Sequence, residues 1–352
     1  MNPTEFLHSN HLKYVEYGTG NFPVSPGFHD VGGVYTSISV TNRGIMDLPF
    51  HMNRLFQSCV YLDYFSATES SKIQFIQHVL QSIDQAIFGK PVSNGLLIIC
   101  CGKTLESSID VSVLFHPTHS FSSHIMDANY TVNFFPIQRA PAQIKYTKWV
   151  LERQPLIDQR DSDVQETLIY YRGEDNVEYL TEGLTTTFYI LMEDNTIVMP
   201  PTEKILYGSV QRWAQIIAPS LSVNLLIKPI PISSFSEWKG AFVTSSGRIM
   251  QPIHKVKFSN EQLLERFPRE IVFEYPENHS ITKLKDVLFH LIHSPSSKDS
   301  DMEKYEQEFL AKIQYNPWIF PGNEHTWGHE LLEEGLPSKI IEALTIIQSQ
   351  QS

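Results

Sequence analysis

Basic residues, cysteines and long apolar runs are all scarce in this chain of 352 residues. Lysine and arginine together number 27 against 39 acidic residues, which gives a formal net charge of −12. Nucleic acids and anionic membrane surfaces are bound by clustered basic side chains, so this balance argues against both as partners. No apolar run approaches the roughly 18 residues that a membrane-spanning helix requires. We therefore expect neither a nucleic-acid partner nor a membrane span.

The three cysteines, Cys59, Cys100 and Cys101, are too few for a disulfide framework. Cys100 and Cys101 are adjacent, so they are poorly placed to pair, and they end an apolar run with the length of a buried strand. The first residues lack the basic and apolar regions of a secretory signal. A reducing cytoplasm is the expected location.

The chain is long enough for two domains with separate cores, and its patterning indicates an α+β fold. Residues 1–136 are predicted to form a small N-terminal domain, because alternating or continuous apolar runs indicate strands and apolar residues at helical spacing indicate helices. The strands are expected at 33–40, 96–101, 109–115 and 130–135, and the helices at 51–64 and 70–87.

Residues 137–143 are predicted to link the domains, because proline and small residues disfavour both helix and central strand. Residues 144–280 should form a larger second domain, and residues 281–352 a helical C-terminal extension. Strands are expected at 166–171, 186–192, 196–199 and 240–244, and helices at 209–218, 261–267, 281–290, 302–314 and 338–347.

Three segments could bind an anion. Arg54 lies near the start of a predicted helix, where a cation opposes the macrodipole, and its planar guanidinium suits a phosphate. Gly208 precedes another helix, whose first amides, those of Ser209 and Val210, point outward. The run from Thr244 to Gly247 adds two serine hydroxyls after a strand. Taken singly, these features are equally typical of a surface arginine, a helix start and a plain turn.

Two further residues could carry chemistry. Lys145 follows the linker beside Ile144 and several aromatic residues, a setting that can depress the pKa of an amine and make it nucleophilic. A surface lysine is the alternative. Glu182 is an acid before a glycine ahead of a predicted strand, which alone indicates only a turn.

In their order along the chain, these segments resemble the fold-type IV family of pyridoxal-phosphate enzymes, which contains branched-chain and D-amino-acid aminotransferases and aminodeoxychorismate lyase. The resemblance covers about residues 25–255. It rests on Gly33-Val34-Tyr35-Thr36, His51-Met52-Asn53-Arg54-Leu55, Ile144-Lys145, Thr181-Glu182-Gly183 with Phe188, Leu206-Tyr207-Gly208-Ser209-Val210, and Thr244-Ser245-Ser246 through Pro252-Ile253.

The resemblance implies pyridoxal 5′-phosphate as the cofactor and assigns roles to its residues. Lys145 would hold the cofactor as a Schiff base and then act as general base, and Glu182 would contact the pyridine nitrogen. Tyr35 and Lys103 would face the substrate. The phosphate would be bound by Arg54, Ser209, Val210, Ser245 and Ser246.

Several positions depart from the family pattern. Thr36 stands where an acid is usual, Thr187 where an asparagine is usual, and Gln211 where an arginine is usual, with Arg212 next. An arginine-glycine pair that several members use for the substrate carboxylate reads Cys101-Gly102 here, with Lys103 adjacent. The resemblance thus implies a retained cofactor site and leaves the substrate unassigned.

We expect an aminotransferase that exchanges an amino group between an amino acid and a 2-oxo acid. A lyase of the aminodeoxychorismate type and a non-catalytic cofactor-binding homologue are the alternatives. The resemblance also implies a homodimer. No metal site is expected, because His325 and His329 lack the H-E-x-x-H order and Gly328 weakens the helix needed to present them.

Overall fold

The computed structural model describes residues 7–12, 33–41, 44–87, 95–103, 109–117, 130–258, 261–276 and 279–293. These residues divide into two compact units. The first takes the described residues before position 122 together with Ile144–Val150, and the second takes those in 122–143 and 151–313. No helix in the described ranges is long and apolar enough to cross a membrane.

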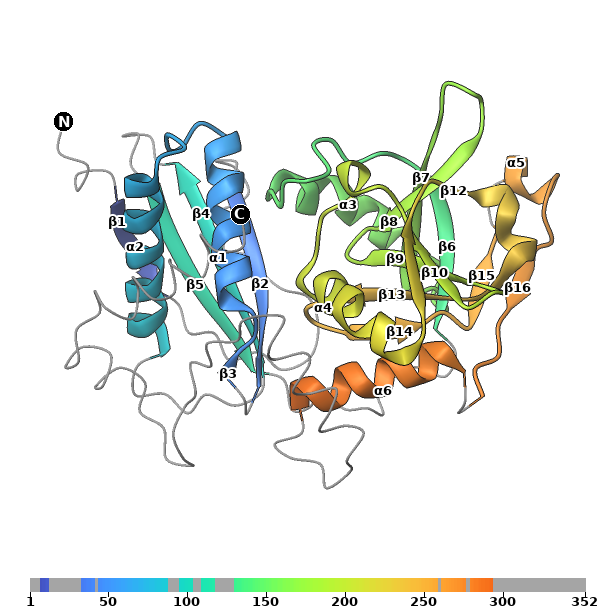
Figure 1. Ribbon diagram of the computed structural model, residues 1–352. Helices are drawn as coiled ribbons and strands as arrows, with labels where there is room; N and C mark the ends of the chain where they lie inside the picture. Colours follow the sequence, from blue (N-terminus) through green and yellow to red (C-terminus); the bar gives the residue numbers. More distant parts are fainter. Residues whose placement is uncertain are drawn as a thin grey trace. The chain divides into compact units, whose positions relative to one another are not determined.

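The first unit is a five-stranded sheet with two helices on one of its faces (Figure 1). The strand order is β1-β5-β4-β2-β3, and all neighbours are antiparallel except β1 and β5. The strands are β1 (Leu7–Leu12), β2 (Gly33–Thr41), β3 (Gly44–Ile45), β4 (Gly95–Lys103) and β5 (Ile109–Pro117), and the helices are α1 (Leu48–Tyr61) and α2 (Glu69–Ile87).

Apolar residues from these helices and from alternate positions of β2, β4 and β5 form one buried core. The strands and helices expected at 33–40, 51–64, 70–87, 96–101 and 109–115 are confirmed. Helix α1 begins three residues before the expected start, and Pro49 occupies its first turn, where a proline costs no hydrogen bond.

The second unit is built on a larger sheet, whose main path runs β11-β10-β9-β8-β7-β6-β15-β16. Strand β12 pairs with β8, and β13 pairs with both β9 and β14. The strands are β6 (Thr131–Pro136), β7 (Glu166–Arg172), β8 (Glu178–Gly183), β9 (Thr187–Met192), β10 (Thr196–Met199), β11 (Asn224–Ile227), β12 (Ile230–Pro231), β13 (Trp238–Ser245), β14 (Ile249–Pro252), β15 (Lys255–Lys257) and β16 (Glu270–Val272).

Helix α3 (Lys148–Asp158) leads the chain into this unit, and the described residues after it form three further α-helices. They are α4 (Ser209–Ile217), α5 (Glu261–Leu264) and α6 (Ser280–His293). Among the described residues, the sheets and helices give the expected α+β class. The helices expected at 302–314 and 338–347 lie outside the described residues.

Two segments differ from the sequence interpretation. The strand at 130–135 was expected to complete the first domain, but β6 lies between β7 and β15 in the second sheet. Residues 144–150 were expected in the second domain, but they belong to the first unit. An apolar run predicts a strand but not the sheet that receives it, because its pairing partners are distant in sequence.

Candidate functional site

In the first unit, Lys145 is fixed beside strand β2 by main-chain hydrogen bonds. The Tyr35 N–H donates to the Lys145 carbonyl at 2.9 Å, and the Thr147 N–H donates to the Gly33 carbonyl at 2.8 Å. The Gly33 N–H in turn donates to the Thr147 hydroxyl at 2.9 Å. The Lys145 amine, Nζ, lies 5.0 Å from the centroid of the Tyr35 ring. This anchoring explains why residues 144–150 belong to the first unit.

A buried histidine, His51, lies near both Arg54 and Lys145. His51 is 1% exposed, and its Nδ1 lies 2.8 Å from the hydroxyl of Thr36, which is fully buried. Arg54 Nη2 donates to the same hydroxyl at 3.0 Å. Burial, followed by the charges of Arg54 and Lys145, holds the pKa of His51 well below its ordinary value. A neutral His51 with two cations nearby makes this region suitable for an anionic group.

In the second unit, Glu182 is a buried carboxylate near the end of β8, paired across the hairpin with Thr187 of β9. It lies within a strand, so the sequence interpretation of an acid in a turn ahead of a strand was wrong. Glu182 is 4% exposed. Its Oε1 lies 3.0 Å from Arg139 Nε, and its Oε2 accepts hydrogen bonds from Arg139 Nη2 at 3.3 Å and from the Leu206 N–H at 3.1 Å.

Sequence reasoning missed Arg139 as a partner of this acid. Arg139 lies in the segment predicted to be a linker, yet it is only 5% exposed and also donates to the Ala142 carbonyl. Its distance of 43 residues from Glu182 matches no local spacing rule. Arg139 could have been identified from the chemistry of a buried acid. A carboxylate in an apolar strand needs a cation or several hydrogen-bond donors, and Arg139 is the arginine of the predicted linker.

The predicted anion-binding segments of the second unit come together. Helix α4 begins at Ser209, and the side-chain hydroxyl of Ser209 lies 3.5 Å from that of Ser246. Ser245 stabilises the turn that carries Ser246, because its hydroxyl accepts the Arg248 N–H at 3.2 Å. Gln211, which stands where the family has an arginine, accepts the Gly208 N–H at 3.2 Å and so caps the helix. The first amides of an α-helix lack intrahelical partners, and they suit an anion.

One short segment connects the Glu182 carboxylate to the anion-binding start of α4. Leu206, which binds Glu182, stands two residues before Gly208 and three before α4. Thr187, the strand partner of Glu182, pairs on its other side with Thr244 of β13, next to Ser245. A buried carboxylate and a helix start with two hydroxyls therefore lie in one unit. These residues fit pyridoxal phosphate, whose ring nitrogen needs an acid and whose phosphate needs amide and hydroxyl donors.

The two residues predicted to face the substrate lie on the first sheet. Tyr35 is half-buried in β2 opposite Cys100 of β4, and Lys103 is exposed at the end of β4. Cys100 and Cys101 are buried in that strand as expected, and burial together with the neighbouring Cys101 thiol raises the pKa of Cys100. His325 and His329 lie outside the described residues.

Comparisons with known proteins agree with this arrangement. The sequence pattern of the family described as amino-transferase class IV matches residues 33–256. No curated protein matches the chain significantly in sequence. Solved structures share the fold at low sequence identity.

The branched-chain amino acid aminotransferase from Escherichia coli is 13% identical, with 78% of this chain and 89% of that chain covered and a TM-score of 0.60. The enzyme of the same name from Thermoproteus uzoniensis, solved with norvaline, is 15% identical, with 82% and 91% covered and a TM-score of 0.60. The 4-amino-4-deoxychorismate lyase from Pseudomonas aeruginosa is 14% identical, with 78% and 96% covered and a TM-score of 0.56. The chain therefore belongs to the class IV aminotransferase family of pyridoxal-phosphate enzymes.

Proposed function

We propose that the protein is an aminotransferase that moves an amino group between an amino acid and a 2-oxo acid. The observation that carries this proposal is the buried Glu182 carboxylate, compensated by Arg139 and joined through Leu206 to the start of α4. A buried ion pair beside a helix N-terminus is expensive to maintain without a ligand that uses both, since burial of charge costs several kcal/mol.

When bound, pyridoxal phosphate supplies a ring that withdraws electrons from the substrate Cα. Glu182 would face the ring nitrogen and keep a proton on it, and Arg139 would hold the carboxylate in place. Lys145 would bind the cofactor through its Nζ and, once released, move the proton at the substrate Cα. Arg54, the Ser209 and Val210 amides and the hydroxyls of Ser245 and Ser246 would bind the phosphate.

A lyase of the aminodeoxychorismate type is the second candidate, because lyase structures also share this fold, with TM-scores of 0.55 and 0.56. Both reactions need the same lysine and the same acid, so the cofactor residues do not separate them. We propose that Tyr35 and Lys103 contact the substrate, and these contacts would determine which of the two reactions takes place. A non-catalytic homologue would carry out neither reaction. The feature in favour of this alternative is the Cys101-Gly102 pair, which replaces the family's arginine and glycine.

We further propose that the protein acts as a homodimer in the cytoplasm on small-molecule substrates. The class IV resemblance supports dimerisation. The three cysteines are buried and none of them forms a disulfide, which suits a reducing compartment.

The deciding experiment is an absorption spectrum of the purified protein before and after borohydride reduction, followed by peptide mass spectrometry. We expect a visible band that reduction removes and a pyridoxyl adduct on Lys145. The neighbouring Lys148 is the internal control, since an adduct there would show that the motif register is wrong. The absence of any adduct would contradict cofactor binding through Lys145. Added 2-oxo acids separate the two reactions. An aminotransferase transfers the amino group to the 2-oxo acid, whereas a lyase releases its product without a 2-oxo acid.

A further inference from the structure

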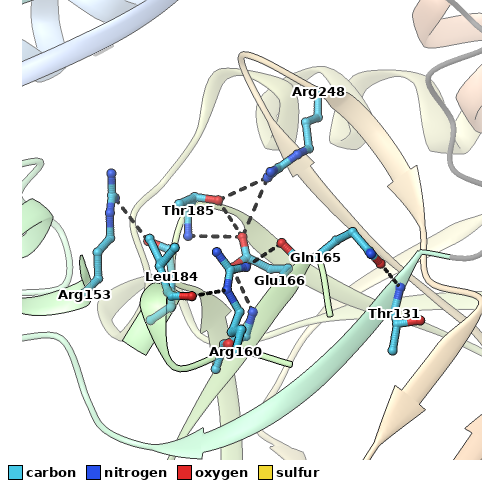
Figure 2. A network of polar contacts seen from close by, with 10 residues as sticks. Thr131, Arg153, Arg160, Gln165, Glu166, Leu184, Thr185 and Arg248 are labelled. Carbon is cyan, nitrogen blue, oxygen red and sulfur yellow. Dashed lines mark hydrogen bonds and ion pairs between the residues drawn. The ribbon is translucent and has the colours of Figure 1, made fainter. Parts of the chain in front are cut away.

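A second buried carboxylate, Glu166, lies at the start of β7, and the roles given above make no use of it (Figure 2). It is 1% exposed. Its Oε1 accepts the Thr167 N–H at 2.9 Å. Its Oε2 accepts both the N–H and the hydroxyl of Thr185, at 3.3 and 2.5 Å. Because a buried charge is stable only when it is paired and hydrogen-bonded, these contacts are costly to break.

The turn that joins β8 to β9 is closed around this side chain. A Cβ added to Gly183 would lie 3.0 Å from both Cγ and Cδ of Glu166 and 2.2 Å from the Thr186 hydroxyl, so this position requires glycine. The Gly183 N–H donates to the Thr186 carbonyl at 2.8 Å. Glu182 and Thr187 flank this turn directly, so the position of the turn sets the position of Glu182.

The same carboxylate reaches the turn that carries the serine hydroxyls. Arg248 Nη1 donates to the Thr185 hydroxyl at 3.2 Å and lies 3.8 Å from Glu166 Oε2 (Figure 2). Arg248 closes the turn that begins at Ser245, and Ser246 of that turn faces Ser209 of α4. Thr185 therefore donates to Glu166 and accepts from Arg248, which joins the two turns through one hydroxyl.

We propose that Glu166 is a positioning residue. It fixes the turn between β8 and β9, which Glu182 flanks, relative to the serine turn, residues 245–248, which carries Ser246. This inference rests on the proposed function, because it assigns the two turns to the two ends of one cofactor. Glu166 touches neither end itself. It would act by holding the acid and the phosphate donors at the separation that the cofactor requires, which preorganises the site.

The sequence offers a matched pair of variants. Arg160 and Arg248 each place Nη1 3.8 Å from an oxygen of Glu166, but only Arg248 belongs to the serine turn. Arg248→Gln should weaken the affinity for pyridoxal phosphate about threefold to tenfold, and Arg160→Gln should change it by less than about twofold, whatever either does to thermal stability. Equal losses of cofactor affinity in the two variants would show that Glu166 acts only through the stability of the fold, and would overturn the proposal.

Thr185→Val removes the joining hydroxyl but keeps the Thr185 N–H that also bonds Glu166, so it tests the link at a smaller cost in stability than a change of Glu166 itself. We expect it to weaken cofactor binding as much as Arg248→Gln does, and the double variant to be no weaker than either single one. Additive losses would mean that Arg248 contacts the phosphate directly, which would refute the link through Thr185. Glu166→Gln, if it folds, should show the largest loss, about tenfold or more.

Amide hydrogen exchange on the cofactor-free protein gives a readout that does not depend on binding. In Thr185→Val, exchange should rise in both residues 183–187 and 245–248, while residues 33–41 of β2 serve as the internal control. Faster exchange in only one of the turns would overturn the proposal. If wild type forms no adduct on Lys145, the proposed function fails, whereas the exchange result still decides whether Glu166 couples the turns.

Discussion

The ion pair between Arg139 and Glu182 can be tested for its contributions to stability and to turnover separately. Both side chains are about 95% buried, and the guanidinium contacts both carboxylate oxygens, at 3.0 and 3.3 Å. Removing one partner of such a pair leaves an uncompensated buried charge. We therefore expect Arg139→Gln and Glu182→Gln each to lower the free energy of unfolding by about 3–5 kcal/mol.

The double variant removes both charges and leaves two carboxamides that can bond to each other. Its free energy of unfolding should return to within about 1–2 kcal/mol of the wild-type value, because no isolated charge remains. Turnover should not return with it. Glu182→Gln and the double variant should both lose about two orders of magnitude in turnover, since neither supplies the negative charge that the ring nitrogen requires.

Stability would be measured by urea unfolding of protein freed of cofactor with hydroxylamine, so that bound ligand adds nothing to the folded state. Turnover would be measured as the half-reaction with a panel of amino acids at saturating cofactor. Wild-type turnover in the double variant would refute the assignment of Glu182 to the ring nitrogen. Single variants as stable as wild type would refute the ion pair.

Four further outcomes are expected. Arg54→Ala should weaken cofactor binding by about 2 kcal/mol or more and Ser246→Ala by about 1 kcal/mol in an absorbance titration, and unchanged binding in Arg54→Ala would place the phosphate elsewhere. The lowered pKa of His51 means that the unfolded chain takes up a proton below pH 6.5 that the folded state resists. Stability should thus fall as the pH decreases below 6.5, by up to about 1 kcal/mol per pH unit, and His51→Asn should reduce that slope. The raised pKa of Cys100 should leave this thiol unalkylated by iodoacetamide at pH 8 until the protein is denatured, as mass spectrometry would show. Sedimentation at micromolar concentration should show a dimer, and a fully active monomer would contradict the proposed assembly.

Local patterning predicted most elements of the fold and the motifs of the candidate site. The helix at Ser209 and its glycine followed from turn chemistry, and the strand at Gly33 followed from its alternation. Strand β8 was missed, because a charged residue next to glycine is typical of a turn. The helix α3 was also missed, because Pro155 lies inside it and no clear apolar stripe marks one face.

The partners of the buried acids could not be predicted. Glu182 and Arg139 are 43 residues apart, and Glu166 and Arg248 are further apart still. A long-range ion pair depends on how strands from different parts of the chain are ordered in the sheet, which no local period records. The residue types nevertheless constrain the answer, since a buried carboxylate must have compensation from somewhere. The sequence therefore predicts that partners exist and does not identify them.

The location of the changed Cys101-Gly102 pair supports the proposed enzyme over a non-catalytic homologue. Cys101 pairs with Val34 and Gly102 with Gly33 inside the first sheet, where they continue the regular ladder of strands β2 and β4. The Glu182 carboxylate is held in the second unit by Arg139 and Leu206, so neither Cys101 nor Gly102 takes part in these contacts. A protein that had lost its chemistry would have no reason to keep a buried, fully compensated charge while its substrate residues changed, because an apolar replacement is often as stable or more so. A buried, compensated acid together with a changed Cys101-Gly102 pair is therefore what we expect of the proposed enzyme with an altered substrate site.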